Sequence, residues 1–144
     1  MSKIRKLAIV GTGNIARVHA MACSEIEGVE LYAVCDQDGE RARAFAEAWH
    51  FAKHYDTVHA LIEAKPDVIS ICTPHRSHPS LIEQVTGAGI TCMVEKPLAV
   101  DLASARQAVE VARNSGTTLG VIFQRRYWPA AQRLKKAIEE GRLG

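Results

Sequence analysis

The feature that most constrains the fold is a regular alternation of short apolar runs with longer amphipathic stretches. The apolar runs are uninterrupted, which is typical of strands buried on both faces of a parallel sheet. The amphipathic stretches repeat apolar residues at helical spacing, as with Ala42, Phe45, Ala46 and Trp49. The alternation predicts right-handed βαβ crossovers. The expected class is therefore α/β, with a doubly wound parallel sheet of about six strands in a three-layer αβα arrangement.

Glycine, proline and capping residues set the limits of the expected elements. Asp38 and Asp101 are expected to cap helices, and Pro129 is expected in the first turn of the last one. The expected strands cover residues 7–10, 30–35, 51–56, 67–72, 91–94 and 118–123. The expected helices cover residues 14–25, 38–50, 57–64, 78–86, 101–116 and 130–140.

Composition and charge exclude several classes of protein. The 144 residues suffice for one core, and 47% apolar with 24% charged residues is typical of globular chains. A net charge of +2 without a basic block argues against a nucleic-acid partner. No apolar run approaches the roughly 18 residues of a membrane span. The basic start, residues 1–6, precedes too short an apolar run for a secretory signal, so we expect a cytoplasmic protein without a membrane partner.

The four cysteines are expected to be reduced core thiols. Three of them lie in apolar runs, and they form no Cys-x-x-Cys pair: Cys23, Cys35, Cys72 and Cys92. A disulfide framework is disfavoured in a chain with this much core.

A glycine-rich turn follows the first predicted strand and opens the first predicted helix. In this turn Gly11 permits a tight bend, Gly13 lets the backbone approach a diphosphate, and Ala16 permits close packing of helix on strand. The backbone N–H groups around Asn14 and Ile15, together with the helix dipole, favour an anion. The turn therefore predicts a Rossmann-type dinucleotide site.

The second predicted strand ends at Asp36, about twenty residues after Ala16, where a carboxylate can accept both ribose hydroxyls of the adenosine half. A 2′-phosphate there would meet like charge, because unit charges about 4 Å apart repel by roughly 4 kcal/mol at an effective dielectric constant near 20. No arginine directly follows Asp36, and Arg41 and Arg43 lie further along the next helix. We predict NAD, with NADP disfavoured by roughly ten- to a hundredfold. The alternative is a glycine turn needed only for packing, with Asp36 a helix-entry residue.

Further motifs follow in a fixed order: Thr73-Pro74-His75-Arg76-Ser77-His78, Glu95-Lys96-Pro97, Arg126-Tyr127-Trp128-Pro129 and Gly141-Arg142-Leu143-Gly144. With the glycine turn, their order and spacing resemble the Gfo/Idh/MocA oxidoreductases, the family of glucose–fructose oxidoreductase and inositol dehydrogenase. The resemblance extends over the whole chain but covers only the N-terminal part of that family's architecture. It implies an NAD(P)-binding Rossmann domain over residues 1–124. Residues 125–144 would begin the connection to a C-terminal substrate domain.

The resemblance implies that Lys96 is catalytic and lies beside the nicotinamide and the substrate. Its place at the carboxyl end of a central strand agrees, since ligands of open parallel sheets bind there. A lysine there can donate to the substrate hydroxyl that becomes a carbonyl and, if buried, share in proton transfer. Glu95 resembles a residue that reaches the nicotinamide ribose. Pro97 resembles a proline that often follows a cis peptide, which would fix the direction of Lys96. The alternative is an exposed Glu-Lys pair in a turn.

The resemblance also implies the remaining cofactor contacts. The backbone of Thr73 and Pro74 would line the nicotinamide side. His75 stands where many members have asparagine, so its contact differs in reach and charge. His78 matches a histidine at the start of the next helix, with a structural hydrogen bond as the alternative. Arg126 matches an arginine close to the cofactor, with a surface or inter-domain role as the alternative.

Two other interpretations of histidine are weaker. His19 lies on the first expected helix, where a packed or capped residue is expected rather than a catalyst. The spacing of Cys72, His75 and His78 suggests a metal site, but no fourth ligand is evident, so we expect none.

The family's substrate pocket comes mainly from a second α/β domain, which the family's chain enters near the position of Gly144. The resemblance thus implies an NAD(P)-dependent oxidoreductase that moves a hydride between nicotinamide and a sugar, polyol or related hydroxy compound. The 144 residues are expected to bind the cofactor without being active alone. The alternative is a stand-alone NAD-binding module with regulatory or structural work. An apolar patch is expected around Val121, Phe123, Tyr127 and Trp128, with homo-oligomers forming through it or through the last helix.

Overall fold

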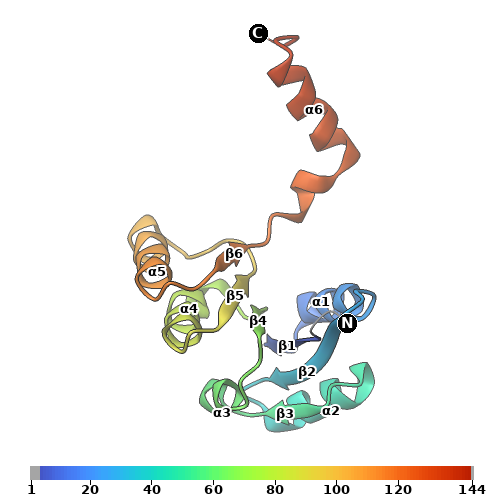
Figure 1. Cartoon of the computed structure of the whole chain (residues 1–144), viewed down its shortest axis with the longest axis vertical. Helices are drawn as coiled ribbons and strands as arrows, with labels where there is room; N and C mark the ends of the chain where they lie inside the picture. Colours follow the sequence, from blue (N-terminus) through green and yellow to red (C-terminus); the bar gives the residue numbers. More distant parts are fainter. Residues whose placement is uncertain (1–3, 144) are drawn as a thin grey trace.

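The computed structural model describes residues 4–143 and forms a single sheet of six strands (Figure 1). Every neighbouring pair is parallel, and the order across the sheet is β3-β2-β1-β4-β5-β6. The strands are β1 (Arg5–Val10), β2 (Val29–Cys35), β3 (Lys53–Tyr55), β4 (Val68–Ile71), β5 (Thr91–Val94) and β6 (Leu119–Val121). The predicted doubly wound α/β class is confirmed. Residues 1–3 and Gly144 lie outside the described residues, and with them the outer limits of the predicted domain and the last residue of the Gly141-Arg142-Leu143-Gly144 motif.

Each predicted helix is also present. The helices are α1 (Asn14–Ser24), α2 (Gly39–Trp49), α3 (Val58–Glu63), α4 (His78–Gly87), α5 (Leu102–Asn114) and α6 (Pro129–Glu139). Asp38 and Asp101 cap α2 and α5 through their side chains, as predicted. Two short 3-10 helices were not predicted, η1 (His75–Ser77) and η2 (Gln124–Tyr127). β6 is shorter than predicted because its one neighbour, β5, ends at Val94 and offers no partner beyond it.

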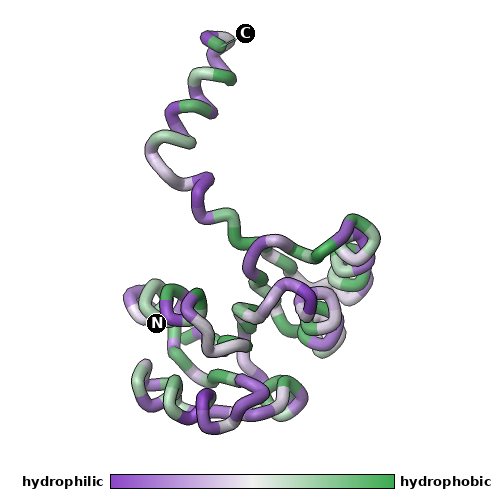
Figure 2. The backbone as a smooth tube through the Cα atoms, turned by 180° about the vertical axis from the view of Figure 1, so that it is seen from behind, coloured by the Kyte–Doolittle hydropathy of each residue, from purple (hydrophilic) through white to green (hydrophobic). Residues whose placement is uncertain are grey.

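The sheet carries one core on each face, which explains why its strands are apolar runs without interruption. Side chains such as Val10, Ile71 and Val94 pack on one face with residues of α3, α4 and α5. Ile9 and Val34 pack on the other face with residues of α1 and α2. Figure 2 shows the hydrophobic strands lying between helices whose hydropathy alternates. The three-layer αβα prediction is therefore confirmed.

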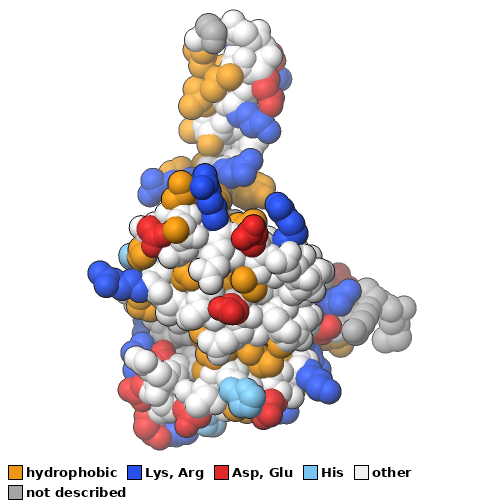
Figure 3. Space-filling model, turned by 90° about the vertical axis from the view of Figure 1, so that its left-hand side faces the viewer, with side chains coloured by type: hydrophobic (Ala, Val, Ile, Leu, Met, Phe, Trp, Pro, Cys, Tyr) orange, Lys and Arg blue, Asp and Glu red, His pale blue; other side chains and the backbone are white. Residues whose placement is uncertain are grey.

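The C-terminal part projects from this sandwich. Figure 1 shows η2 and α6 extending away from the edge strand β6. α6 has no buried residue, and its apolar side chains Leu134 and Ile138 are exposed. Figure 3 shows hydrophobic side chains gathered along one side of this helix. Phe123, Tyr127 and Trp128 are also exposed, as predicted, and Val121 is half-buried.

Candidate nucleotide-binding site

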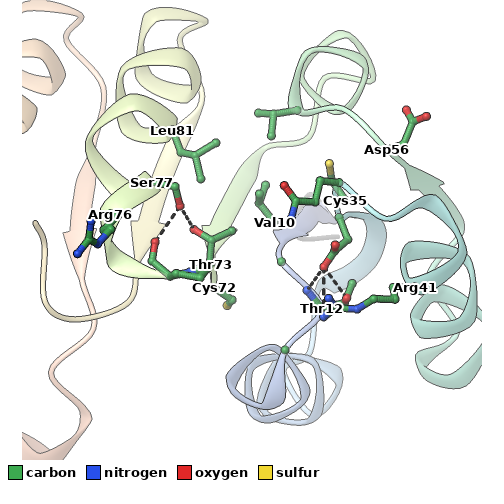
Figure 4. A pocket seen from close by; sticks show the side chains of 16 residues that line it. Val10, Thr12, Cys35, Arg41, Asp56, Cys72, Thr73, Arg76, Ser77 and Leu81 are labelled. Atoms are coloured by element: carbon green, nitrogen blue, oxygen red, sulfur yellow. Dashed lines mark hydrogen bonds and ion pairs between the residues drawn. The ribbon is translucent and has the colours of Figure 1, made fainter.

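A cleft opens at the carboxyl ends of the strands, beside the point where the strand order reverses between β1 and β4. Ligands of open parallel sheets bind in such a crevice. The cleft has a volume of about 530 Å³. Figure 4 shows Thr12, Cys35, Arg41 and Asp56 on one side, with Thr73, Arg76 and Ser77 on the other. It is lined by Val10, Gly11, Thr12, Gly13, Cys35, Asp36, Gln37, Arg41, Asp56, Val58, Cys72, Thr73, Pro74, Arg76, Ser77 and Leu81.

The two glycines of the turn are required for different reasons. Gly11 has φ +93°, and a Cβ built on it would lie 2.9 Å from the carbonyl oxygen of Cys72. Backbone conformation and packing therefore both demand glycine there. Gly13 has φ −74°, and a Cβ on it would meet nothing within 4 Å. No residue from 4 to 143 requires a glycine at this position, and the open space in front of it fits the close approach of a diphosphate.

The start of α1 leaves backbone donors for an anion. Gly13 is the N-cap residue, and its position supplies no capping side chain. The first turn of α1 also carries no acidic residue. Free N–H groups and the positive end of the helix dipole thus face the mouth of the turn, next to Asn14 and Ile15. The side chains of these two residues do not line the cleft, so their predicted role is confined to the backbone.

Asp36 is held in place from several directions. Its Oδ2 accepts hydrogen bonds from the backbone N (2.9 Å) and Oγ1 (2.6 Å) of Thr12, and its Oδ1 accepts one from the backbone N of Asp38 (3.1 Å). Burial favours the neutral acid, but the donors from Thr12 and Asp38 and the charge of Arg41 outweigh it and lower the pKa of Asp36. The carboxylate is therefore ionised and fixed at the end of β2.

Arg41 changes the prediction made for Asp36. The sequence placed this arginine further along the helix, yet its Nη2 lies 3.6 Å from Oδ2 of Asp36 and its side chain lines the cleft. One turn into α2 is near enough because Asp38 caps the helix directly beside the strand end. A carboxylate offers roughly four acceptor positions, and Thr12 and Asp38 already use three of those on Asp36. Asp36 thus has room for about one ribose hydroxyl, not both.

The turn after β4 forms the opposite wall of the cleft. Oγ1 of Thr73 lies 2.8 Å from Oγ of Ser77, which also donates to the carbonyl of Pro74. These bonds hold η1, whose residues Arg76 and Ser77 line the cleft. Thr73 and Pro74 line it as predicted. His75 is exposed and is not part of the lining, so its cofactor contact stays a prediction.

His78 connects this turn to the next one. The residue is 1% exposed, with Nε2 at 2.9 Å from the carbonyl oxygen of Thr73 and Nδ1 at 2.9 Å from that of Pro97. Its side chain is therefore enclosed by two backbone carbonyls, which is the structural alternative raised by the sequence. The ring holds the turn after β4 against the turn after β5. The peptide bond between Lys96 and Pro97 is cis, as the resemblance implied.

Glu95 supports the turn from below. Its Oε2 accepts the backbone N–H of Lys96 at 3.0 Å, and its Oε1 lies 3.0 Å from Nε2 of His19. Nδ1 of His19 in turn lies 2.8 Å from Oγ of Ser70. Both carboxylate oxygens are thus engaged within the protein, so the contact with the nicotinamide ribose stays a prediction. His19 is packed, as predicted, but it does more than fill space, because it links α1 to β4 and β5.

The side chain of Lys96 is exposed at the carboxyl end of β5. Glu95 and His78, whose side chains contact the backbone of Lys96 and Pro97, are buried. Arg126 lies in η2 and lines a separate hollow with Tyr127, Gln132 and Lys135. The structure therefore does not bring Arg126 to the cleft.

Within residues 4–143, no group of three or more His, Cys, Asp or Glu side chains is arranged to hold a metal ion. The ring nitrogens of His78 both face carbonyl oxygens and so cannot ligate one. The cysteines among these residues are unpaired thiols. In the same part of the chain, no helix is both long and apolar enough to cross a membrane.

Several cleft residues were missed by sequence reasoning. Thr12 sits between the two glycines, and its hydroxyl would have been a signal for an Asp36 partner. Arg76 and Ser77 lie between His75 and His78, the two residues of that motif for which a role was predicted. The others come from strand ends and helices that meet only in the folded chain: Cys35, Asp56, Val58 and Leu81.

The geometry agrees with a family comparison. The family model described as "Oxidoreductase family, NAD-binding Rossmann fold" (GFO_IDH_MocA) matches residues 5–123. The chain belongs to the Gfo/Idh/MocA oxidoreductase family. It is an NAD-binding Rossmann domain, and the open space before Gly13 and the free N-terminus of α1 fit the diphosphate of that cofactor.

Curated Gfo/Idh/MocA relatives share about a third of the sequence. A D-apiose dehydrogenase of Paraburkholderia graminis is 36% identical over 140 residues, which cover 96% of this chain and 37% of the relative. A D-glucoside 3-dehydrogenase of Escherichia coli is 36% identical over 141 residues, covering 96% and 40%. An inositol 2-dehydrogenase of Rhizobium meliloti is 36% identical over 141 residues, covering 96% and 42%. The chain thus spans about two fifths of the length of these relatives.

Solved structures show the same fold. The WlbA dehydrogenase of Bordetella pertussis, in complex with NADH and UDP-GlcNAcA, superposes with a TM-score of 0.93 at 29% identity. The match covers 99% of this chain and 44% of that one. A putative myo-inositol dehydrogenase of Sinorhizobium meliloti gives a TM-score of 0.86 at 34% identity, covering 97% and 42%.

Proposed function

We propose that this domain is the nucleotide-binding part of an NAD-dependent dehydrogenase that moves a hydride between nicotinamide and a hydroxyl-bearing carbon. One observation carries the proposal. His78 holds the turn of Thr73 and Pro74 against the turn of Lys96 and Pro97 through carbonyl contacts of 2.9 Å each. These contacts support a position for Lys96 near the part of the cleft that we propose for the nicotinamide. A module that only bound NAD would have no need of a charged donor at that edge.

Lys96 is the proposed catalytic residue. The nicotinamide, when bound, supplies the hydride acceptor or donor. The ammonium of Lys96 would donate a hydrogen bond to the substrate oxygen and stabilise the charge that develops on it. Lys96 is exposed to solvent in the described part of the chain. Other groups, from the substrate or from a further domain, would therefore have to cover it before it could transfer a proton efficiently.

The proposed substrate is a sugar, polyol or related hydroxy compound. Support comes from the relatives, which are dehydrogenases of apiose, a glucoside and inositol. Because the chain spans about two fifths of their length, we propose that residues 125–144 begin a connection to a substrate domain. The projecting α6, which buries no residue, supports this interpretation.

Assembly and location are proposed with the same function. The exposed apolar side chains of Phe123, Tyr127, Trp128 and Leu134 favour burial against another surface. We propose that the enzyme is a homo-oligomer. Its unpaired cysteines suit the reducing cytoplasm, where we place it.

Calorimetric titration of the chain with NAD tests the nucleotide site. A turnover screen of the full-length gene product against sugars and inositols, read by NADH absorbance, tests the reaction. We expect Lys96→Met to lower kcat by roughly a hundred- to ten-thousandfold, and Lys96→Arg to retain part of it. NAD binding without turnover of any polyol would favour a regulatory or structural module instead.

A further inference from the structure

His19 is a buried polar residue of α1 that the proposed reaction does not use. The residue is 9% exposed, and both of its ring nitrogens meet polar groups of the sheet. Nδ1 lies 2.8 Å from Oγ of Ser70 in β4, and Nε2 lies 3.0 Å from Oε1 of Glu95, which directly follows β5. The histidine thus joins α1 to residues 51 and 76 positions further along the chain.

A serine, a histidine and a carboxylate in contact resemble the arrangement that activates a nucleophile. Such a role needs a hydroxyl that a substrate can reach. Ser70 is 0% exposed and Glu95 is 5% exposed, so a substrate atom cannot approach the serine. The three side chains therefore act on the structure around them rather than on a substrate.

The direction of each hydrogen bond follows from the donors available. An ionised carboxylate only accepts, so Nε2 of His19 donates to Glu95. Nδ1 of a neutral ring is then an acceptor, to which the hydroxyl of Ser70 donates. The other carboxylate oxygen of Glu95, Oε2, accepts the backbone N–H of Lys96 at 3.0 Å. The contacts thus run without a gap from Ser70 through His19 and Glu95 to the backbone of Lys96.

His19 limits where the carboxylate of Glu95 can turn. Among residues 4–143, the hydrogen bonds to this carboxylate come from His19 and Lys96. A buried acceptor that loses a partner turns towards another donor, because leaving it unpaired is costly. Loss of the His19 contact would therefore free Glu95 to rotate away from the backbone of Lys96. A displacement of about 1 Å at a reacting group lowers a rate by roughly a hundredfold.

The same helix carries the backbone donors for the cofactor. α1 begins at Asn14, after the N-cap Gly13, and His19 lies about one and a half turns further along. A helix segment of this length behaves as a stiff unit. The position of the N-terminus of α1 is therefore transmitted through His19 and Glu95 to the turn that carries Lys96.

We propose that His19 is a positioning residue, which acts through Glu95 to fix the backbone of Lys96 relative to the helix that faces the cofactor diphosphate. This inference rests on the catalytic role proposed above for Lys96. Turnover then depends on the contact between His19 and Glu95, whereas NAD affinity does not.

Two substitutions separate the contacts of His19. The amide of glutamine reaches the position of Nε2, so His19→Gln keeps a donor for Glu95. Asparagine is shorter, so His19→Asn keeps only the contact with Ser70. In the full-length gene product, we expect His19→Asn to lower kcat by roughly ten- to a hundredfold, with the KM for NAD changed by less than about twofold. His19→Gln should retain kcat within about threefold. Equal losses of kcat in the two variants overturn the proposal.

A double-mutant cycle shows whether His19 acts through Lys96. Lys96→Met removes the group that His19 would position, so adding His19→Asn to it should lower kcat by less than about twofold more. A further fall as large as that caused by His19→Asn alone would mean that His19 acts independently of the lysine, which overturns the proposal.

Hydrogen exchange of the Lys96 amide tests the contact itself in the 144-residue chain. His19→Asn should speed the exchange of this amide by at least about tenfold relative to His19→Gln. The amide of Thr12 is the internal control, because it is held in the same way by the carboxylate of Asp36, at 2.9 Å. Equal acceleration at both amides would indicate a general loss of stability and overturn the positioning role.

The failure of the proposed function looks different. It would appear as no turnover of any polyol by the unchanged enzyme, or as an unchanged kcat in Lys96→Met. In either case, exchange of the Lys96 amide still decides whether His19 holds that backbone.

Discussion

Two parts of the nucleotide site are built differently: the proposed adenosine end, around Asp36, and the proposed nicotinamide end, at the turns that follow β4 and β5. At the adenosine end, the hydrogen bonds and the ion pair are formed by residues that line the cleft or directly follow its lining. There Asp36 is held by Thr12, Asp38 and Arg41. At the nicotinamide end, the polar contacts lie beneath the cleft, where His19 and His78 hold the turns from below. Lys96, which those turns display, is itself exposed.

This difference shows what each end has to do. The adenosine end would bind a part of the cofactor that does not change during a reaction. Its side chains can therefore form hydrogen bonds with one another before the cofactor binds. The nicotinamide end, in the function proposed here, would also admit a substrate, and a lysine already paired within the domain would have to break that pair first. Because the supporting residues Glu95 and His78 are buried and Lys96 is exposed, the backbone at Lys96 is held in position while its side chain can still move.

The largest expected effect is a loss of NAD affinity, and it distinguishes the two glycines of the adenosine end, Gly11 and Gly13. Gly13→Val should keep the fold, since φ is −74° and no atom lies within 4 Å of a Cβ. Its side chain would occupy the space of the diphosphate, so we expect NAD affinity to fall by roughly a hundredfold, or about 2.7 kcal/mol. Calorimetry with NAD measures the loss.

Gly11→Ala is the matched comparison. Its φ of +93° and the 2.9 Å approach to the Cys72 carbonyl predict a stability loss of about 1–3 kcal/mol or more. Urea unfolding of both variants checks the contrast. Equal destabilisation by the two substitutions would mean that Gly13 is also a structural glycine, which would remove the main support for the diphosphate position.

The next effect tests the nicotinamide end. His19→Ala removes the partner of Glu95 Oε1 and of Ser70 Oγ, which leaves a 5%-exposed carboxylate with one donor. We expect a loss of about 2 kcal/mol in the free energy of unfolding. Thr12→Val at the other end removes only the 2.6 Å hydroxyl bond to Asp36, which keeps two backbone donors. About 1–2 kcal/mol is expected there.

Urea unfolding at neutral pH compares these two variants directly. The order of the two losses in unfolding free energy is what matters, because Oε1 of Glu95 contacts His19, whereas Asp36 is held by Thr12, Asp38 and Arg41. A greater loss in Thr12→Val than in His19→Ala would contradict the description of the two ends.

The sequence predicted much more of the adenosine end than of the nicotinamide end. Strands, helices, the glycine turn and Asp36 are local features, so periodicity and spacing sufficed to find them. Arg41 was underestimated because reach along a helix depends on where the cap places it. The contact between His19 and Glu95 joins residues 76 positions apart, so no local pattern contains it. The ribose contact assigned to Glu95 from the resemblance stays a prediction, and the contact that the structure shows for its carboxylate is with His19 on α1.

The smallest expected effect concerns buried thiols at the two ends. Burial raises the pKa of Cys92, in β5, from an ordinary value of 9.0 to about 12. Burial raises that of Cys35, beside Asp36, from 9.0 to about 12 as well, with the charges of Asp36 and Asp56 adding to it. The folded chain therefore holds these protons more tightly than the unfolded chain. Their contribution to stability is complete below about pH 9 and is lost as pH rises towards about 12.

Salt distinguishes the two thiols, because screening weakens repulsion from Asp36 and Asp56 but leaves burial unchanged. Urea unfolding at about pH 8 and about pH 10.5, in low and in high salt, measures the alkaline loss of stability. Cys35→Ala should remove a part of that loss that depends on salt, and Cys92→Ala a part that does not. If both variants showed the same salt dependence, the carboxylates of the adenosine end would not reach Cys35. The electrostatic difference between the two ends would then be confined to Asp36 and its immediate partners.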